Sequence, residues 1–451
     1  MIKGKKIAIY GLGKEGVSAA NFLGQDNEVV IIDDKAKKEI DPVLFSNLKV
    51  KNVKFCFDSN YPKDIEFDLI VRSPGVRADH PFIKKMLANG ATLTSPTKIF
   101  FDLCPCPIIG VTGTKGKGTT ASLIYQMLKN QSPNVFLAGN IGTPALDILP
   151  KLTQASIIVL ELSSFQLVDL EKSPHIAVVL MITSEHLDWH QDTSDYRRAK
   201  ESIVSYQSKN DLAIINRDFQ AAKNLAQKTK AQVYYFSTIS QTNGTYLSGD
   251  KIISNIEDPE EICKTSQVFL PGKHNLQNVL AAVAVAKIQK VKSRNIIKAL
   301  STFKGLPHRL QLVGEVKGVK FVNDSYSTIP ETTIAAIEAF ENPKILIIGG
   351  SSKNSNFTGL GQQINKDKSV KTIILVGQEA GRIRQAIEAA GGTKAEIIEG
   401  AKNMHQIVNL AYSKAKSGNI VILSPACASF DMFKNYQDRG DLFTLKVKNL
   451  K

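Results

Sequence analysis

The stretch GVTGTKGKGTTASL, residues 110–123, places glycines and lysines between a run of small apolar residues and a helical pattern. This order predicts a buried strand, a tight loop and a helix. Consecutive backbone N–H groups of a glycine-rich loop, together with the dipole of the helix, bind phosphate. Lys117 would reach the β- and γ-phosphates of a nucleotide. The stretch therefore indicates a nucleotide site, with a glycine-rich helix start of purely structural role as the alternative.

The loop departs from the usual P-loop at two positions. Val111 stands where the first glycine is expected, and Gly118 stands directly after the lysine, where a Ser or Thr normally binds magnesium. Thr119 or Thr120, displaced by one or two positions, can still offer a hydroxyl to Mg²⁺.

The composition is typical of a globular protein with two or three domains, since the chain has 451 residues, of which 43% are hydrophobic and 22% charged. No apolar run reaches the roughly 18–20 residues that span a bilayer, and the first residues lack the pattern of a signal peptide. The five cysteines show no disulfide framework and no paired CxxC spacing. We therefore expect a cytoplasmic protein.

The net charge of +15 would suit a nucleic-acid-binding protein. However, the lysines are spread along the whole chain, without a dense basic block or interleaved aromatic residues. A lysine-rich surface with pockets for anionic substrates is the favoured interpretation.

Three times the chain returns to an alternation of short apolar runs and helical patterns, which predicts α/β domains with parallel sheets. The apolar runs end in Gly, Asp or Ser-Pro-Gly, as buried parallel strands do. Helical periodicity fills the gaps, for example over residues 330–340 and 380–391. We place the domains at residues 1–96, 97–305 and 306–451.

The segment GLGKEG, residues 11–16, follows a predicted strand and opens a helix, and Asp33 and Asp34 stand at the end of the next strand. This arrangement is typical of a dinucleotide-binding turn. NAD remains one candidate ligand, and another nucleotide or diphosphate on the helix N-terminus is favoured.

The segment VLELSSFQL, residues 159–167, delivers Glu161 to the end of an apolar strand, beside Ser163 and Ser164. A carboxylate at that place suits a second contact to Mg²⁺ in a phosphoryl-transfer site. The alternative is a solvated acid in a loop.

The segment TSEHLDWHQDTSDYRRAK, residues 183–200, gathers four possible ligands at a strand end: Glu185, His186, Asp188 and His190. Their spacing matches no recognised zinc pattern, so magnesium ligation or substrate contact is favoured over zinc. A surface loop is the structural alternative.

In the last third of the chain, polar clusters follow the predicted strands. They are GLPHR with Arg309, NDSYST with Asp324 and Thr328, GGSSK with Lys353, and SPACASFDMFKNYQDRG. Because ligands of open α/β sheets bind beyond the carboxyl ends of the strands, these clusters together predict a site.

Six segments follow one another in the order and spacing of the Mur ligases: ELSSFQL, GNIGTPAL, GKHNLQN, GLPHRL, NDS and SPACASFDMFKNYQDRG. The chain resembles this family over nearly its whole length, in particular the members that add D-glutamate. The resemblance implies an N-terminal Rossmann-like domain for a UDP moiety, a central P-loop ATPase domain with a mostly parallel sheet, and a C-terminal Rossmann-like domain for the amino acid.

The resemblance also implies the reaction, which is ATP-driven, ADP-forming addition of D-glutamate to UDP-N-acetylmuramoyl-L-alanine in peptidoglycan precursor synthesis. A carboxylate is a poor electrophile, and its phosphorylation to an acyl phosphate supplies a leaving group for attack by the amine. Two Mg²⁺ ions, bridged by a carbamylated lysine, would assist. We expect a monomer that binds these small substrates, without nucleic acid and without membrane insertion.

Matching motifs assign the site residues. The catalytic residues would be Lys117, His186 and Lys200. ATP would contact Gly113, Thr114, Lys115, Gly116, Lys117, Gly118, Thr119, Thr120, Asn278, Arg309 and Asp324. Magnesium would be held by Thr119, Glu161, His186 and carbamylated Lys200. The UDP substrate would contact Lys14, Glu15, Asp34, Lys35, Ser73, Pro74, Gly75, Asn140, Ser164 and Gln166. The amino acid would contact Thr328, Lys353, Ser429 and Tyr436.

The loop GTKGKGTT resembles the related folylpolyglutamate synthases more than the D-glutamate-adding members, because a glycine follows the lysine. In that relative the next hydroxyl serves the metal, which favours Thr119 over Thr120. A folylpolyglutamate-type ligase is therefore a second hypothesis.

Other departures lie near the predicted substrates. Glu185 replaces an aspartate and Met181 an asparagine, while Tyr326 stands where a lysine is frequent and Tyr436 where a phenylalanine is common. Together with Gly118, Tyr326 leaves a third hypothesis, a catalytically inactive protein that binds a nucleotide sugar.

Overall fold

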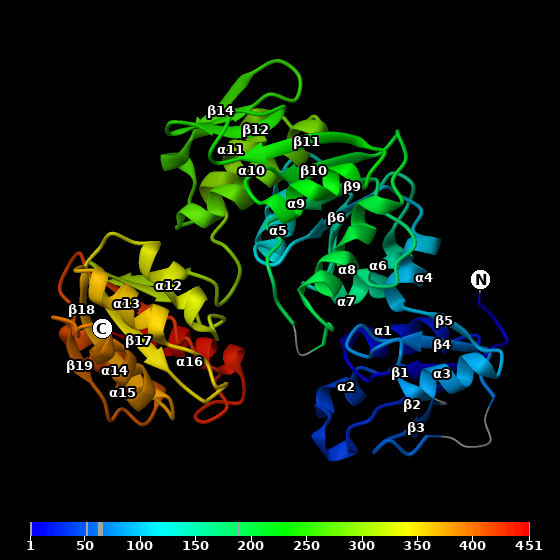
Figure 1. The fold of residues 1–451 in the computed structure, drawn as a ribbon, viewed down its shortest axis with the longest axis horizontal. Coiled ribbons are helices and arrows are strands. Elements are labelled where there is room, and N and C mark those ends of the chain that lie inside the picture. Colours follow the sequence, from blue (N-terminus) through cyan, green and yellow to red (C-terminus); the bar gives the residue numbers. More distant parts are fainter. Residues whose placement is uncertain (1, 51–52, 62–65, 187–188, 451) are drawn as a thin grey trace. The chain divides into compact units, whose positions relative to one another are not determined.

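The computed structural model describes residues 2–50, 53–61, 66–186 and 189–450, which form two compact units (Figure 1). The first unit comprises residues 1–267 and 277–299, and the second comprises residues 268–276 and 300–451. Within the described residues, the strands form sheets of five, nine and six members. This arrangement confirms the predicted three-domain α/β architecture.

The N-terminal sheet is parallel throughout, with the order β3-β2-β1-β4-β5. Side chains alternate between its faces, so Ile7 and Ile9 of β1 join one core while Ala8 and Tyr10 join another. Both faces are therefore buried, as in Rossmann-like domains. The elements are β1 (Lys6–Tyr10), α1 (Lys14–Leu23), β2 (Glu28–Ile32), α2 (Pro42–Ser46), β3 (Val53–Cys56), β4 (Leu69–Arg72), α3 (Pro81–Ala88), β5 (Thr92–Thr94) and α4 (Pro96–Leu103).

The central sheet has the order β14-β13-β12-β11-β10-β9-β6-β8-β7. It is parallel from β7 to β12, whereas β13 and β14 pair antiparallel at its edge. Its strands are β6 (Ile108–Thr112), β7 (Val135–Gly139), β8 (Ile157–Glu161), β9 (Ile176–Val179), β10 (Leu212–Asn216), β11 (Gln232–Ser237), β12 (Gly244–Ser248), β13 (Lys251–Ser254) and β14 (Glu260–Lys264).

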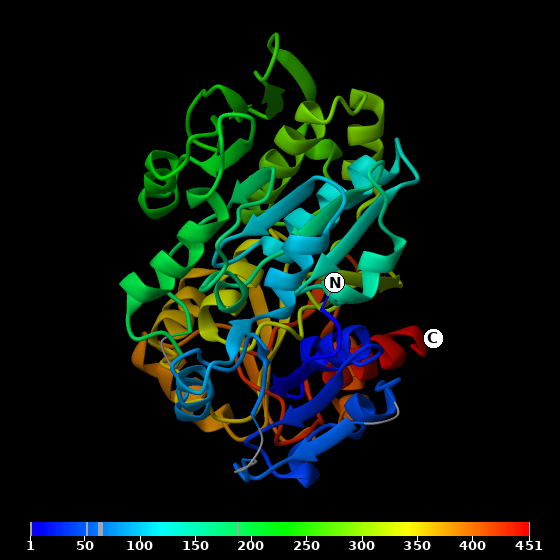
Figure 2. The same ribbon diagram turned by 90° about the vertical axis from the view of Figure 1, so that its right-hand side faces the viewer.

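Helices lie on both faces of this sheet (Figures 1 and 2). They are α5 (Lys117–Lys129), α6 (Ala145–Ile148), α7 (Ser164–Leu167), α8 (Thr193–Ser205), α9 (Gln220–Lys223), α10 (Lys273–Ile288) and α11 (Ser293–Thr302). The chain leaves β6 toward β8 and β7 on one side and later returns to β9 on the other. The end of β6 is thus a topological switch point, where open α/β sheets bind their ligands.

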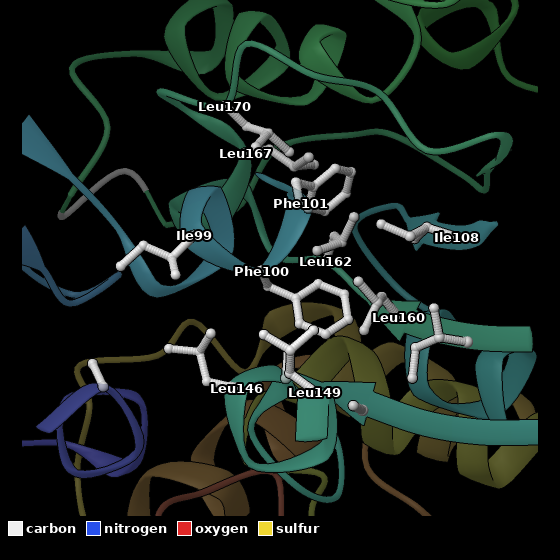
Figure 3. Packing of buried hydrophobic residues seen from close by; sticks show 14 of the residues in the cluster. Ile99, Phe100, Phe101, Ile108, Leu146, Leu149, Leu160, Leu162, Leu167 and Leu170 are labelled. Atoms are coloured by element: carbon white, nitrogen blue, oxygen red, sulfur yellow. The ribbon is translucent and has the colours of Figure 1, made fainter. Parts of the chain in front are cut away.

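The N-terminal and central domains share one hydrophobic core. Its members come from β1 and α1 as well as from α4, β8 and α8. Figure 3 shows the ring of Phe100, from α4, facing Leu146, Leu149 and Leu160. Arg72, at the end of β4, is fully buried and pairs with Asp169 at 3.0 Å, so a charge pair accompanies the apolar contact.

The C-terminal sheet has the order β15-β16-β20-β17-β18-β19 and is parallel except for the β15–β16 pair. One core joins it to α12, α13 and α14, and a second joins it to α15 and α16. The elements are β15 (Gln311–Val316), β16 (Val319–Asn323), α12 (Pro330–Glu338), β17 (Lys344–Gly349), α13 (Thr358–Lys366), β18 (Val370–Val376), α14 (Ala380–Ala389), β19 (Glu396–Ile398), α15 (Met404–Lys414), β20 (Ile420–Leu423) and α16 (Tyr436–Lys448).

Across the described part of the chain, none of the helices combines the length and the apolar character that crossing a membrane requires.

Candidate active site

The loop between β6 and α5 has the geometry predicted for a phosphate site. Gly116, the residue before the helix, has φ of +87°. A Cβ at this position would lie 2.1 Å from Oδ1 of Asn278, so both the backbone and the neighbouring side chain require glycine. The sequence folds locally in this way because glycine adopts this left-handed turn at no steric cost.

Lys117 folds back over the loop. Its ammonium group donates to the carbonyl oxygens of Gly113, at 3.1 Å, and Thr114, at 2.9 Å. The hydroxyl of Thr114 in turn accepts from the backbone N–H of Thr183 at 2.9 Å and from Tyr196 at 3.1 Å. Thr114 therefore anchors the loop to the segment after β9, while Lys117 supplies its positive charge.

The two threonines after Gly118 differ in their surroundings. The hydroxyl of Thr120 is fully buried and lies 3.2 Å from Oδ1 of Asn278, to which it donates. Thr119 retains 8% exposure. The hydrogen bond to Asn278 gives Thr120 a structural role, and the assignment of Thr119 to the metal stays a prediction.

Lys200, from α8, lies inside the central domain with only 1% of its surface exposed. Its amine is 3.3 Å from Oγ1 of Thr112 and 4.8 Å from the centre of the Tyr196 ring. Burial and then the charge of Lys117 lower its pKa well below the ordinary value, against the opposing effect of Glu185 and Glu161. The environment of Lys200 therefore favours the uncharged form of its amine more than water does.

Glu161 ends β8 and is nearly buried. Its Oε1 accepts a hydrogen bond of 3.0 Å from the side-chain amide of Asn140. A residue predicted to bind metal and one predicted to bind the muramoyl substrate therefore lie side by side.

The segment after β9 carries the other predicted ligands. Glu185 pairs with Lys115. Although burial raises the pKa of Glu185, its hydrogen bond to Lys115 and the charges of Lys117 and His186 bring it below the ordinary value. Glu185 is thus an anion neutralised by the phosphate loop. Asp188 lies outside the described residues.

The two histidines of this segment have different environments. His190 is buried, with Nδ1 3.1 Å from Asp195 and Nε2 3.0 Å from the hydroxyl of Ser164. Because both ring nitrogens have protein partners, His190 is no longer a candidate metal ligand. The ring of His186 packs 4.8 Å from that of Phe165. Among the described side chains, no three from His, Cys, Asp and Glu gather as a metal site.

The GLGKEG turn meets the central domain within the first unit. Glu15 accepts a 3.2 Å hydrogen bond from Gln166. Burial, and secondarily the charge of Asp147, raises the pKa of Glu15 to about 7, although the bond from Gln166 opposes the shift. Two residues predicted to contact the UDP substrate, from different domains, are thus in direct contact, and Lys14 is exposed beside them.

Asp33 and Asp34, which follow β2, accept hydrogen bonds from the GLGKEG turn and from neighbouring segments. Asp33 accepts from the backbone N–H groups of Leu12, at 2.7 Å, and Lys35, at 3.0 Å. Asp34 accepts from the hydroxyls of Tyr10, at 2.8 Å, and Tyr61, at 2.6 Å. The side chains of Asp34 and Lys35 remain exposed at the predicted uridine end.

Side-chain hydrogen bonds fix the Ser73-Pro74-Gly75 segment. Ser73 donates to the Gly11 carbonyl at 2.6 Å, and Arg72 donates to the Pro74 carbonyl at 3.2 Å. The indole N–H of Trp189 donates to the Gly75 carbonyl at 3.0 Å. The GLGKEG turn and this segment therefore form one preorganised surface.

In the second unit, Asp324 is buried at the end of β16 and accepts from the backbone of Leu310 at 3.0 Å and from the hydroxyl of Ser424 at 2.8 Å. Burial raises its pKa to about 6, partly offset by these hydrogen bonds. The guanidinium of Arg309 stacks 3.7 Å from the centre of the Tyr326 ring, and Tyr436 meets that ring edge-on at 5.0 Å. Tyr326, the departure from the family, thus supports a predicted ATP residue.

The SPACAS loop contains Ser429, which is buried, whereas Lys353 is exposed and Thr328 is half-buried. The sequence analysis did not identify Arg439, a buried residue of α16, as part of this site. Its guanidinium donates to the carbonyls of Ala428, at 3.1 Å, and Cys427, at 3.2 Å. The only sequence signal was its place inside the long SPACASFDMFKNYQDRG segment.

Comparison with known proteins agrees with this geometry. Residues 5–95 match the family description "Mur ligase MurD-like, N-terminal domain", residues 111–286 match "Mur ligase middle domain", and residues 308–427 match "Mur ligase, glutamate ligase domain". The chain belongs to the Mur ligase family.

Its similarity to individual proteins extends over the full length. The UDP-N-acetylmuramoylalanine--D-glutamate ligase of Clostridioides difficile (strain 630) is 37% identical over 456 residues, covering 100% of both chains. The enzyme of the same name from Acetivibrio thermocellus is 38% identical, covering 100% of this chain and 97% of that one. UDP-N-acetylmuramate-alanine ligase MurC from Thermotoga maritima shares the fold with a TM-score of 0.62 at 17% identity, covering 99% and 100%.

Proposed function

We propose that this chain is an ATP-dependent ligase that joins D-glutamate to UDP-N-acetylmuramoyl-L-alanine in peptidoglycan precursor synthesis. The observation that carries the proposal is the full-length similarity to curated D-glutamate ligases. The phosphate loop at the switch point of the central sheet supports it, because amide formation from a carboxylate requires activation. The NAD hypothesis finds no support in these relatives.

In the proposed mechanism, the backbone of the β6–α5 loop and Lys117 hold the phosphates of ATP. A carboxylate oxygen of the muramoyl-alanine substrate attacks the γ-phosphorus, ADP leaves, and an acyl phosphate forms. The amine of D-glutamate then attacks the acyl phosphate, and phosphate leaves. Cations and backbone dipoles bring these anions together and stabilise the developing charge. Asn278, Arg309 and Asp324 complete the proposed ATP contacts.

The residues around the loop fit magnesium. Glu161 and His186 offer an anionic oxygen and a ring nitrogen, and Thr119 offers a hydroxyl, which are ligand types that divalent ions accept. When bound, Mg²⁺ would neutralise phosphate charge. A comparison of two variants tests the Thr119 assignment. Thr119→Ala should raise the Mg²⁺ concentration needed for half-maximal turnover more than Thr120→Ala does. The reverse ranking would contradict the assignment.

We propose that Lys200 is carbamylated. The reaction adds CO₂ to an uncharged amine and releases a proton, so a buried lysine with a lowered pKa is suited to it. The product is an anion, which would contribute oxygen ligands to a second Mg²⁺.

The remaining assignments form part of the same proposal. The UDP moiety and muramoyl group contact the surface formed by Lys14, Glu15, Asp34, Lys35, Ser73, Pro74, Gly75, Asn140, Ser164 and Gln166. The amino acid contacts Thr328, Lys353, Ser429 and Tyr436. The enzyme acts as a cytoplasmic monomer, with domain boundaries near residues 96 and 305.

The decisive experiment measures phosphate release on mixing ATP, UDP-N-acetylmuramoyl-L-alanine and single amino acids. We expect release with D-glutamate and background rates with L-glutamate. A folate acceptor in place of the muramoyl substrate tests the folylpolyglutamate-type alternative suggested by Gly118. Folded protein that binds the UDP substrate calorimetrically, yet turns over with no amino acid, would instead support the inactive nucleotide-sugar-binding protein.

A further inference from the structure

A cavity of about 500 Å³ opens at the end of the central sheet opposite to the phosphate loop. Ile108, in its wall, begins β6, whereas the phosphate loop follows the other end of that strand. His175 and Asp211, also in its wall, directly precede β9 and β10. The cavity is therefore separate from the proposed active site. Its wall also contains Cys104 and Cys106.

The two cysteines form a close pair. Their sulfur atoms are 3.7 Å apart, and Cys104 Sγ also lies 3.4 Å from the carbonyl oxygen of Cys106. Cys104 caps α4 in an extended conformation, with φ of −64° and ψ of 121°. The separation of the two sulfur atoms places both side chains on the same side of the chain, and Pro105 restricts the backbone between them. The local sequence thus preorganises a dithiol.

The charged side chains of the cavity wall are paired with one another or with neighbours. His175 lies 2.9 Å from Asp211, Lys172 lies 2.5 Å from Asp102, and Glu171 lies 3.1 Å from Lys98. These pairs satisfy the charged groups, which leaves the two thiols as the reactive chemistry at this wall. Cys104 is half-buried and Cys106 is nearly buried, so the first is the more accessible to a reagent in the cavity.

We propose that Cys104 and Cys106 form a reversible dithiol–disulfide site that exchanges with low-molecular-weight disulfides. The sulfur atoms, 3.7 Å apart, need to approach by roughly 1.7 Å to reach the disulfide bond length of about 2.05 Å. Intracellular disulfides of this kind are transient and redox-sensing rather than structural.

The exchange proceeds in two displacements. The Cys104 thiolate attacks one sulfur of the small disulfide, and one small thiolate leaves. The Cys106 thiolate then attacks Sγ of Cys104 in the mixed disulfide and expels the second small thiolate. The protein loses two protons and two electrons, and the small disulfide is reduced to two thiols.

The rate of exchange should depend on pH. Burial raises the pKa of both thiols, that of Cys106 to about 12, with the neighbouring sulfur adding to the shift for Cys106 and opposing it for Cys104. Because the thiolate is the nucleophile, the rate should rise about tenfold for each pH unit below these pKa values. Exchange should therefore be slower at neutral pH than in alkaline buffer.

The test treats the full-length folded protein with oxidised glutathione in mildly alkaline buffer, followed by rapid alkylation, trypsin and mass spectrometry. Both cysteines fall in one tryptic peptide, residues 99–115. We expect this peptide to resist alkylation and to lose two hydrogens, and dithiothreitol to restore both alkylation sites. Cys104→Ser and Cys106→Ser should each stop at a glutathione adduct, whereas Cys263→Ser, the matched control, should leave the internal disulfide unchanged.

Two outcomes would overturn the proposal, and neither requires a variant. One is a wild-type peptide that remains fully alkylated, and the other is a wild-type peptide that accumulates a stable glutathione adduct at one cysteine. Either result shows that the pair does not close. Ligase turnover plays no part in the readout, so the proposal is independent of the proposed function.

Discussion

Gly116→Ala should disrupt the phosphate loop more than any other single methyl group added there. The residue has φ of +87°, in the left-handed region, and an alanine Cβ would lie 2.1 Å from Oδ1 of Asn278. That contact is far below van der Waals separation, so Asn278 must move. Its movement breaks the 3.2 Å hydrogen bond from the buried hydroxyl of Thr120.

The magnitude has two parts. A non-glycine residue in the left-handed region costs about 1–2 kcal/mol. A buried polar group left without its partner costs about 1–3 kcal/mol. We expect the free energy of unfolding to fall by about 2–5 kcal/mol in total, a large fraction of the usual 5–15 kcal/mol. The displaced loop should also hold the nucleotide less tightly. We expect the KM for ATP to rise about tenfold, which would correspond to about 1.4 kcal/mol of binding free energy.

The assay combines urea unfolding with phosphate release at varied ATP concentration. Gly381→Ala is the matched control, since it lies in α14 and its added Cβ would meet no atom within 4 Å. The control should keep the wild-type KM and lose no stability. A Gly116→Ala protein with the wild-type urea midpoint and KM would show that the loop does not require its left-handed turn.

The remaining predictions concern three side chains. Lys200→Ala should be nearly inactive in the phosphate assay and partly rescued by small carboxylates, and full activity without them would contradict the carbamate. The raised pKa of Asp324 means that its ionised form penalises folding above pH 6, so Asp324→Asn should stabilise the protein there by up to about 3 kcal/mol. As pH falls from about 6 to 4, native Asp324 takes up its proton before the unfolded chain does, and the difference in urea unfolding should vanish; a gain that persists at pH 4 would refute this cause. Tyr326→Leu should raise the KM for ATP about 2–30-fold by removing the ring under Arg309, whereas Tyr326→Phe should leave it unchanged; equal KM values in the two variants would exclude stacking.

Much of the fold was predictable from the sequence. In the sequence, the buried parallel strands are short apolar runs that end in glycine or an acidic residue. The strands β1, β6 and β17 lie at the positions that these runs predict. The edge strands β12 to β14, in which β13 and β14 pair antiparallel, were not predicted. β13 reads KIIS and β14 reads EEICK, so neither shows the strict alternation of polar and apolar residues that marks a half-buried strand.

The candidate site was predictable where one motif supplies both the loop and the side chain, as for Gly116 and Lys117. Contacts between distant segments were not predictable. Arg439 binds the carbonyl of Ser325, 114 residues away, at 2.9 Å, and His190 binds Ser164 across a helix and a strand. The sequence around each residue does not predict such a hydrogen bond, because the contact depends on how the folded sheet brings distant segments together.

The shared core of the first unit has a consequence for exchanging parts between relatives. The cluster that contains Ile7 also contains Leu225, so it draws on two successive domains. The clusters of the second unit, among the described residues, begin at Leu310. A hybrid enzyme joined near residue 300 would leave these three clusters undivided, with only residues 268–276 of the second unit coming from the other parent. A joint near residue 96 would divide the cluster that contains Ile7. The proposed amino-acid site should therefore be more readily exchanged between relatives than the proposed uridine site.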